Sequence, residues 1–150
     1  MIVGIIGSGT MGSGIAQVAA TAGCQVLVYD TNADALGRSQ AKLEKILARL
    51  VVKGRINEEK KADIQRNISY VGELKALAPC NLTIEAIVEN LEVKKKVFSE
   101  LETYVADDAI IASNTSSLSI ASIASSLAKP ERCVGIHFFN PAPLMRLVEV

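Results

Sequence analysis

The sequence Met1-Ile-Val-Gly-Ile-Ile-Gly-Ser-Gly-Thr-Met-Gly-Ser-Gly14 decides the fold of this chain. Its β-branched run over residues 2–6 predicts a short strand that is buried on both faces. The pattern Gly7-x-Gly9-x-x-Gly12 follows at once, and residues 15–22 then predict a helix. Strand, glycine turn and helix, in this order, form the setting in which G-x-G-x-x-G indicates a dinucleotide site. Outside that setting, a glycine-rich turn without a ligand would be the better interpretation.

Each glycine of this turn is expected to have its own role. Gly7 permits the tight turn, Gly9 lets the backbone approach a pyrophosphate, and Gly12 lets the helix pack close to the strand. The helix N-terminus offers unpaired N–H groups and a partial positive charge to the phosphates. We therefore assign the whole loop to the cofactor: Gly7, Ser8, Gly9, Thr10, Met11 and Gly12.

A carboxylate follows where a dinucleotide site needs one. Residues 25–29 predict the second parallel strand, and Asp30 closes it eighteen positions after Gly12, near the ~20 expected for the residue that binds the adenosine ribose. A carboxylate there accepts hydrogen bonds from ribose hydroxyls and repels a 2′-phosphate, so the sequence predicts NAD as the cofactor rather than NADP. The alternative for Asp30 is an ordinary turn or helix-cap residue.

The composition restricts the class of protein. At 150 residues, 49% of them hydrophobic, the chain can bury the core of one domain. Sixteen basic residues balance sixteen acidic ones, so neither nucleic acid nor a membrane surface is expected as a partner. No apolar run approaches the ~20 residues of a membrane span. Three widely spaced cysteines, in apolar contexts, indicate buried thiols rather than disulfides or a metal site, and we expect a cytoplasmic protein.

The remaining pattern alternates strands and helices, which predicts a Rossmann-like doubly wound α/β fold with a mostly parallel sheet and a helical insertion. Further strands are expected at residues 69–71, 82–88, 109–112, 133–139 and 145–150. Further helices are expected at residues 33–52, from 57, at 73–78, at 91–105 with Val93, Val97, Phe98 and Leu101 inward, and around 120–123. We expect the insertion between the second and third strands to form a wall of a substrate site.

Two polar features of these strands stand out, and the second of them suggests a ligand site. Glu85 lies within an apolar strand and needs a partner if it is buried. Residues 113–117, Ser-Asn-Thr-Ser-Ser, follow the carboxyl end of a strand, which is the edge where ligands bind in open α/β sheets. The same residues also serve as caps for the next helix, and the two interpretations are compatible.

Four motifs together resemble the 3-hydroxyacyl-CoA dehydrogenase family, and most of all the short bacterial 3-hydroxybutyryl-CoA dehydrogenases. They are the IGSGTMGSGIAQVAA stretch, IEAIVEN at 84–90, ASNTSSLSI at 112–120 and GIHFFNPAPLMRLVEV at 135–150. The resemblance implies an NAD-dependent oxidoreductase of fatty-acid and butyrate metabolism that interconverts 3-hydroxyacyl-CoA and 3-ketoacyl-CoA. It covers residues 1–150 as the NAD-binding Rossmann domain, while the helical C-terminal domain of the family is absent.

The resemblance also implies roles for individual residues. His137 is the implied acid/base, because a histidine can accept and return the proton of the 3-hydroxyl. Glu149 would orient the imidazole and stabilise its charged form, and Ser116 would hydrogen-bond the substrate oxygen. The other implied contacts are Ser116 and Asn140 beside the nicotinamide, Glu89 and Lys94 on the nicotinamide-ribose side with Lys94 facing inward, and Lys53 on the coenzyme A phosphate.

The implied partners are an acyl-CoA substrate and the missing helical domain, with a homo-oligomer for the intact enzyme. Two alternatives stay open at this point. One is a nucleotide-binding or regulatory module that keeps the fold but has lost catalysis. The other is a different Rossmann dehydrogenase, such as a 2-hydroxyacid or sugar-acid enzyme.

Overall fold

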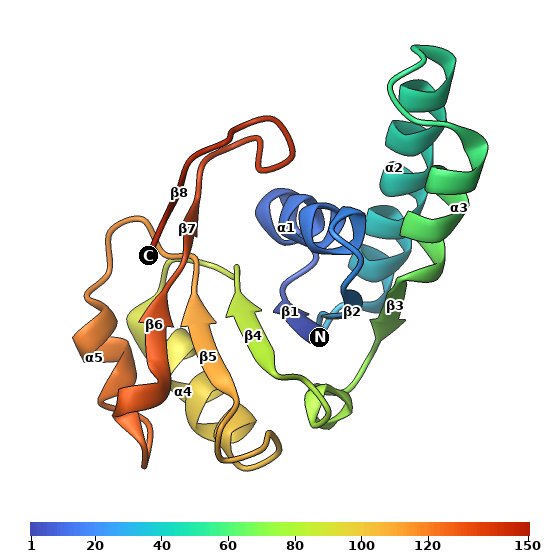
Figure 1. Cartoon of the computed structure of the whole chain (residues 1–150). Coiled ribbons are helices and arrows are strands. Elements are labelled where there is room, and N and C mark those ends of the chain that lie inside the picture. Colours follow the sequence, from blue (N-terminus) through green and yellow to red (C-terminus); the bar gives the residue numbers. More distant parts are fainter.

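Six parallel strands form the main sheet of the protein (Figure 1). In the computed structural model, which describes residues 1–150, their order across the sheet is β3-β2-β1-β4-β5-β6. The strands are β1 (Ile2–Ile6), β2 (Gln25–Tyr29), β3 (Ile68–Val71), β4 (Leu82–Glu85), β5 (Ile110–Ser113) and β6 (Cys133–Gly135). The chain moves outward from β1 in one direction through β3 and then in the other from β4, which confirms the predicted doubly wound fold.

Helices cover both faces of this sheet and enclose two cores. The helices are α1 (Thr10–Thr21), α2 (Ala33–Val52), α3 (Glu58–Arg66), α4 (Leu91–Glu102) and α5 (Ile120–Ala124), with 3₁₀ turns η1 (Leu74–Leu77) and η2 (Pro130–Arg132). Residues of α1, α2 and α3 belong to one core, and residues of η1, α4 and α5 belong to the other. The helices α2 and α3 form a pair that projects away from the sheet (Figure 1). No helix in the fold combines the length and the apolar character that crossing a bilayer requires.

Strand β1 lies at the centre because both of its faces are apolar. Ile5 belongs to the core under α1 and α2, and Ile6 belongs to the core under α4. Both side chains are fully buried, and each contributes about 1.5–3 kcal/mol by leaving water. This confirms the prediction that the first strand is buried on both faces.

The strand predicted at 133–139 is wrong as a single element. β6 ends at Gly135, and His137 and Phe138 form β7, which pairs with β8 (Val148–Glu149) in a separate antiparallel sheet. The reason is that β5 ends at Ser113, so the chain beyond residue 136 has no neighbouring strand to follow. The amide of Phe138 instead donates to the side-chain oxygen of Asn114, at 2.8 Å.

Other boundaries also differ from the prediction. The strand expected at 145–150 is limited to β8. The strand expected at 82–88 stops at Glu85, whose carboxylate accepts a hydrogen bond from the amide of Ile87. The helix expected at 91–105 ends at Glu102, and Val93 faces outward, with 41% of its surface exposed. Helix α1 begins at Thr10, earlier than expected, because Gly9 already occupies the N-cap position.

The expectation that all three cysteines are buried is wrong for two of them. Cys80 is fully buried, whereas Cys24 and Cys133 are partly exposed.

Candidate functional site

The glycine loop has the tight geometry that its sequence predicts. Gly7 has a φ of +101°, which is unfavourable for any residue with a side chain. A Cβ on Gly12 would lie 1.8 Å from the carbonyl oxygen of Gly7, so α1 can approach β1 this closely only with glycine at that position. A Cβ on Gly9, by contrast, would meet no atom within 4 Å. The fold therefore requires two of the three glycines, while the open space at Gly9 is available to a ligand.

The N-terminus of α1 is free to receive an anion. No side chain caps it, and no acidic residue occupies its first turn. The first amide groups of a helix lack partners inside the helix and carry a partial positive charge. Thr10 and Met11 begin this turn, directly after the open position at Gly9. The loop can therefore hold a phosphate group with backbone N–H groups alone.

Asp30 follows β2 and is held by the glycine loop. Its Oδ2 atom accepts hydrogen bonds from the Ser8 amide at 2.8 Å and the Ser8 hydroxyl at 2.7 Å, and its Oδ1 accepts from the Asn32 amide at 3.0 Å. Partial burial is the largest single influence and raises the pKa of Asp30, but these hydrogen bonds, helped by the charge of Arg38, together lower it below its usual value. Asp30 is therefore ionised and fixed in orientation.

A cleft of about 400 Å³ joins the loop to this carboxylate. Gly7, Gly9 and Asp30 line one part of it, and the segment after β4, residues 86–88, lines another. The cleft lies at the carboxyl edge of β1, β2 and β4, where the strand order reverses. Doubly wound sheets bind their ligands at this position.

The only histidine of the chain lies between a hydroxyl and a carboxylate. The Nε2 atom of His137 is 3.2 Å from the Oγ of Ser116, and its Nδ1 is 2.9 Å from an Oε of Glu149. The hairpin of β7 and β8 creates this pair, because its register sets His137 directly opposite Glu149. With a carboxylate accepting the proton on Nδ1, Nε2 is left as the atom that can exchange a proton with a ligand.

Glu89 connects this group to the cleft. It follows Val88, which lines the cleft, and its two carboxylate oxygens accept from the Thr115 hydroxyl at 2.9 Å and the Ser116 amide at 3.2 Å. Partial burial acts most strongly and raises the pKa of Glu89, but these hydrogen bonds and the Lys94 ammonium lower it overall. Lys94 faces inward as expected, with 1% of its side chain exposed.

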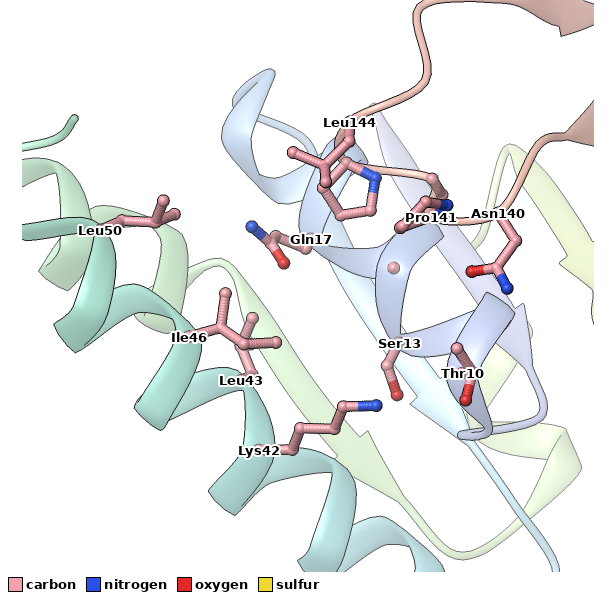
Figure 2. Close-up of a pocket in the computed structure, with 13 residues that line it drawn as sticks. Thr10, Ser13, Gln17, Lys42, Leu43, Ile46, Leu50, Asn140, Pro141 and Leu144 are labelled. Carbon is pink, nitrogen blue, oxygen red and sulfur yellow. The ribbon is translucent and has the colours of Figure 1, made fainter. Parts of the chain in front are cut away.

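A second cavity, of about 440 Å³, lies between α1, α2 and the loop after β7 (Figure 2). Asn140 stands at its edge, and Leu43 and Ile46 form part of its wall. Lys42 extends from α2 into the cavity towards α1 (Figure 2). Lys53 is exposed at the C-cap of α2 and does not line the cavity. Helix α2 of the insertion thus forms one wall of this cavity, which Lys42 lines and Lys53 does not.

Three features of the site were not predicted from the sequence. The double contact of Ser8 with Asp30 has no signal, since the two residues lie 22 positions apart. Lys42 is one of several lysines and arginines on α2, and only the fold shows which of them faces the cavity. The third is the partner of Glu85: the sequence marked this acid as needing a partner but did not identify it as the Lys94 ammonium, which lies at 2.6 Å. No group of three or more His, Cys, Asp or Glu side chains is arranged to hold a metal ion.

The glycine loop with its carboxylate follows strands of the main sheet, and the histidine lies on the hairpin after β6, in contact with Ser116 after β5. A dinucleotide loop combined with an acid/base group is typical of NAD-dependent dehydrogenases of the doubly wound class. Comparison with known sequences identifies the family within that class. The chain belongs to the family described as 3-hydroxyacyl-CoA dehydrogenase, NAD binding domain, whose sequence model matches residues 2–150. This confirms the resemblance seen in the sequence and the prediction of NAD as the cofactor.

Individual relatives agree with this assignment. The chain is 48% identical over 148 residues to a 3-hydroxybutyryl-CoA dehydrogenase of Bradyrhizobium diazoefficiens, covering 99% of this chain and 50% of the relative. It is 46% identical over 148 residues to a 3-hydroxyadipyl-CoA dehydrogenase of Escherichia coli, covering 99% of this chain and 31% of the relative. The crystal structure of a 3-hydroxybutyryl-CoA dehydrogenase from Escherichia coli K12 has a TM-score of 0.97 and 44% identity, over 99% of this chain and 31% of that one. The chain thus spans half or less of the length of these relatives.

Proposed function

We propose that this chain is the NAD-binding domain of an oxidoreductase that interconverts 3-hydroxyacyl-CoA and 3-ketoacyl-CoA, with 3-hydroxybutyryl-CoA and acetoacetyl-CoA as the substrate pair. The observation that carries the proposal is the group of Ser116, His137 and Glu149, joined by contacts of 3.2 and 2.9 Å. A hydroxyl, an imidazole and a carboxylate in this order are the groups that a proton transfer coupled to hydride transfer requires. NAD supplies the hydride acceptor when it is bound.

The protein's own share of the reaction is the movement of one proton. In the oxidation, Nε2 of His137 takes the proton of the 3-hydroxyl while the hydride leaves the same carbon, so that a C=O bond forms. In the reduction, the imidazolium returns that proton to the oxygen. Glu149 holds the ring through Nδ1 and stabilises its charged form, while Ser116 donates a hydrogen bond to the substrate oxygen.

The coenzyme A arm fits the cavity beside α2. The cavity starts at Asn140, which ends the segment that carries His137, and has apolar walls suited to the pantetheine chain. Lys42 adds a cation that suits a phosphate group (Figure 2). Lys53, exposed at the end of the same helix, would meet a phosphate only outside the cavity.

A second domain would cover the hairpin of β7 and β8. After His137, three apolar side chains are exposed: Leu144 by 75% of its surface, Leu147 by 57% and Val150 by 90%. An apolar surface of this kind is typical of a site that a partner covers. We propose that the helical half of the family packs here, closes the site over the acyl-CoA and mediates homo-oligomer formation. The 150-residue chain alone should therefore bind NAD but turn over substrate poorly.

The proposal is tested by oxidation of NADH with acetoacetyl-CoA, using the chain alone and the chain fused to the C-terminal half of the Bradyrhizobium relative. The fusion should be active, and His137→Gln should lower its kcat by roughly 10²–10⁴-fold with NADH affinity unchanged. Glu149→Gln should also lower kcat, through a misoriented ring. Near-normal kcat in the His137 variant would remove this residue from the mechanism, and an inactive fusion that still binds NADH would favour a binding module.

A further inference from the structure

A fully buried ion pair lies directly beneath the proposed site. The Glu85 side chain at the end of β4 is completely buried, and that of Lys94 on α4 is 1% exposed. The Oε1 of Glu85 accepts from the Lys94 ammonium and from the Ile87 amide, both at 2.6 Å, and its Oε2 accepts from the Ser113 hydroxyl at 2.7 Å. Glu85, itself held by the Ser113 hydroxyl of β5 and the Ile87 amide, therefore fixes the Lys94 ammonium of α4 against β4.

The Lys94 ammonium has a second carboxylate within reach. Glu89 lies 3.5 Å away, in a looser contact than the 2.6 Å to Glu85. Glu89 in turn accepts the Ser116 amide at 3.2 Å, and the Ser116 hydroxyl lies 3.2 Å from Nε2 of His137. A continuous series of contacts thus runs from the buried Glu85 to the imidazole.

Stability alone is a poor reason for this pair. Two charges removed from water lose solvation that their attraction barely recovers, and well-packed apolar residues would stabilise the same space as well or better. The location of the pair points the same way, because the series of contacts that starts at Glu85 reaches Ser116 of the proposed site. A role in setting the site explains both its cost and its location.

We propose that Glu85 is a positioning residue of this site: by holding the Lys94 ammonium, it sets the place of Glu89 and, through Glu89, of Ser116 against His137. As a role in the reaction, this rests on the proposed dehydrogenase function. If the Glu85 carboxylate is lost or withdrawn, the ammonium moves to the only other carboxylate in contact with it, Glu89. That movement draws Glu89 away from the Ser116 amide, and the end of the site that faces the nicotinamide is disturbed.

The test uses two variants of Glu85 and a matched control. Glu85→Gln removes the charge, whereas Glu85→Asp keeps the charge but withdraws the carboxylate by one methylene, so that it remains informative if the first variant fails to fold. Glu92→Gln is the control, because it makes the same carboxylate-to-amide change on α4 at a side chain that is 83% exposed and pairs only with Lys95. The ligands are NADH and ADP, which lacks the nicotinamide half and reaches only the glycine loop and Asp30.

In both Glu85 variants the dissociation constant for NADH should rise about tenfold, which corresponds to ~1.4 kcal/mol, while that for ADP stays within twofold. The control should change neither value. The single histidine of the chain provides a second readout, since both imidazole ¹⁵N signals belong to this one residue. The Nε2 signal of His137 should shift in the Glu85 variants and not in the control.

Equal loss of NADH and ADP affinity, or no loss of either, would overturn the proposal in favour of a purely structural pair.

A double variant tests the route through Lys94. In a Lys94→Met background, Glu85→Gln should add less than about a twofold further loss, because no ammonium remains to be held, and independent additive losses would contradict the route. Failure of the dehydrogenase function would appear differently, as an inactive fusion in which the Glu85 variants still separate NADH from ADP.

Discussion

Replacing Gly9 with alanine should remove most of the NADH affinity while leaving the fold nearly unchanged. A Cβ at this position would meet no atom within 4 Å. The backbone φ of −66° is ordinary for alanine. The remaining cost is that of alanine at the N-cap of α1, which is below about 1 kcal/mol. The ligand-free variant should therefore unfold at nearly the same urea concentration as the unmodified chain.

The bound state is different, because the new methyl group occupies the space through which a pyrophosphate approaches the loop. Forcing an extra methyl group into a filled space costs roughly 1–3 kcal/mol. This corresponds to an increase of roughly 5- to 150-fold in the dissociation constant. Urea unfolding without ligand and titration with NADH, followed by fluorescence, measure the two quantities separately.

Two other glycines serve as controls for this experiment. Gly12→Ala should lose both stability and NADH affinity, because its Cβ would lie 1.8 Å from the Gly7 carbonyl oxygen and α1 must move. Gly37→Ala, inside α2 with open space around its Cβ, should gain about 0.5–1 kcal/mol and leave NADH binding unchanged. The reasoning is refuted if Gly9→Ala binds NADH normally, or if it is destabilised as much as Gly12→Ala.

Three further predictions concern single side chains. Asp30→Ala should weaken NADH binding by about 1.5–3 kcal/mol, the value of a hydrogen bond to a charged group. It should also reduce the difference in affinity between NADH and NADPH. Calorimetry that shows equal affinities for NADH and NADPH in the unmodified protein would contradict the assignment. Because the folded protein lowers the pKa of Asp30, its stabilising effect is present above the usual value of 3.8 and is lost as the pH falls through the folded-state pKa. The destabilisation caused by Ser8→Ala should therefore shrink between about pH 6 and pH 3 in urea unfolding, and a constant difference would argue against this coupling. Lys42→Ala should weaken the binding of free coenzyme A, measured by thermal shift. Lys45→Ala, on the same helix but outside the cavity, should leave this binding unchanged. Equal effects of the two variants would exclude a specific contact between Lys42 and coenzyme A.

Local sequence patterns predicted most of this fold because each strand and helix carries its own periodicity. The run over residues 2–6 indicates a buried strand whatever its neighbours are. The segment 133–139 failed for the opposite reason, since its apolar run continues while its partner strand β5 ends at Ser113. The residue at which a strand ends depends on the length of the neighbouring strand, which the local sequence does not indicate.

The candidate site divides in the same way. The glycine loop and Asp30 could be predicted from spacing, because they follow the carboxyl ends of β1 and β2, which are neighbouring parallel strands. His137 and Ser116 lie 21 positions apart and meet only in the fold, so their association came from a family resemblance rather than from spacing. The buried Lys94 shows the limit most clearly: within the run of three lysines at 94–96, charge alone indicates a solvated face, and only Glu85 explains why the first of them points inward.

The hairpin that carries His137 is also the least supported part of the site. Two-stranded hairpins are marginally stable by themselves, and this one extends beyond the main sheet (Figure 1). The amide of Phe138 anchors it to Asn114, while the side chain of Glu149 is 61% exposed. Ser116, by contrast, is fixed from below through Glu89. In the proposed proton transfer, Ser116 is therefore held by its contact with Glu89, whereas the position of His137 depends on the hairpin. We therefore expect a partner that packs on the hairpin to raise turnover more than it raises NADH affinity, and an equal gain in both would contradict this expectation.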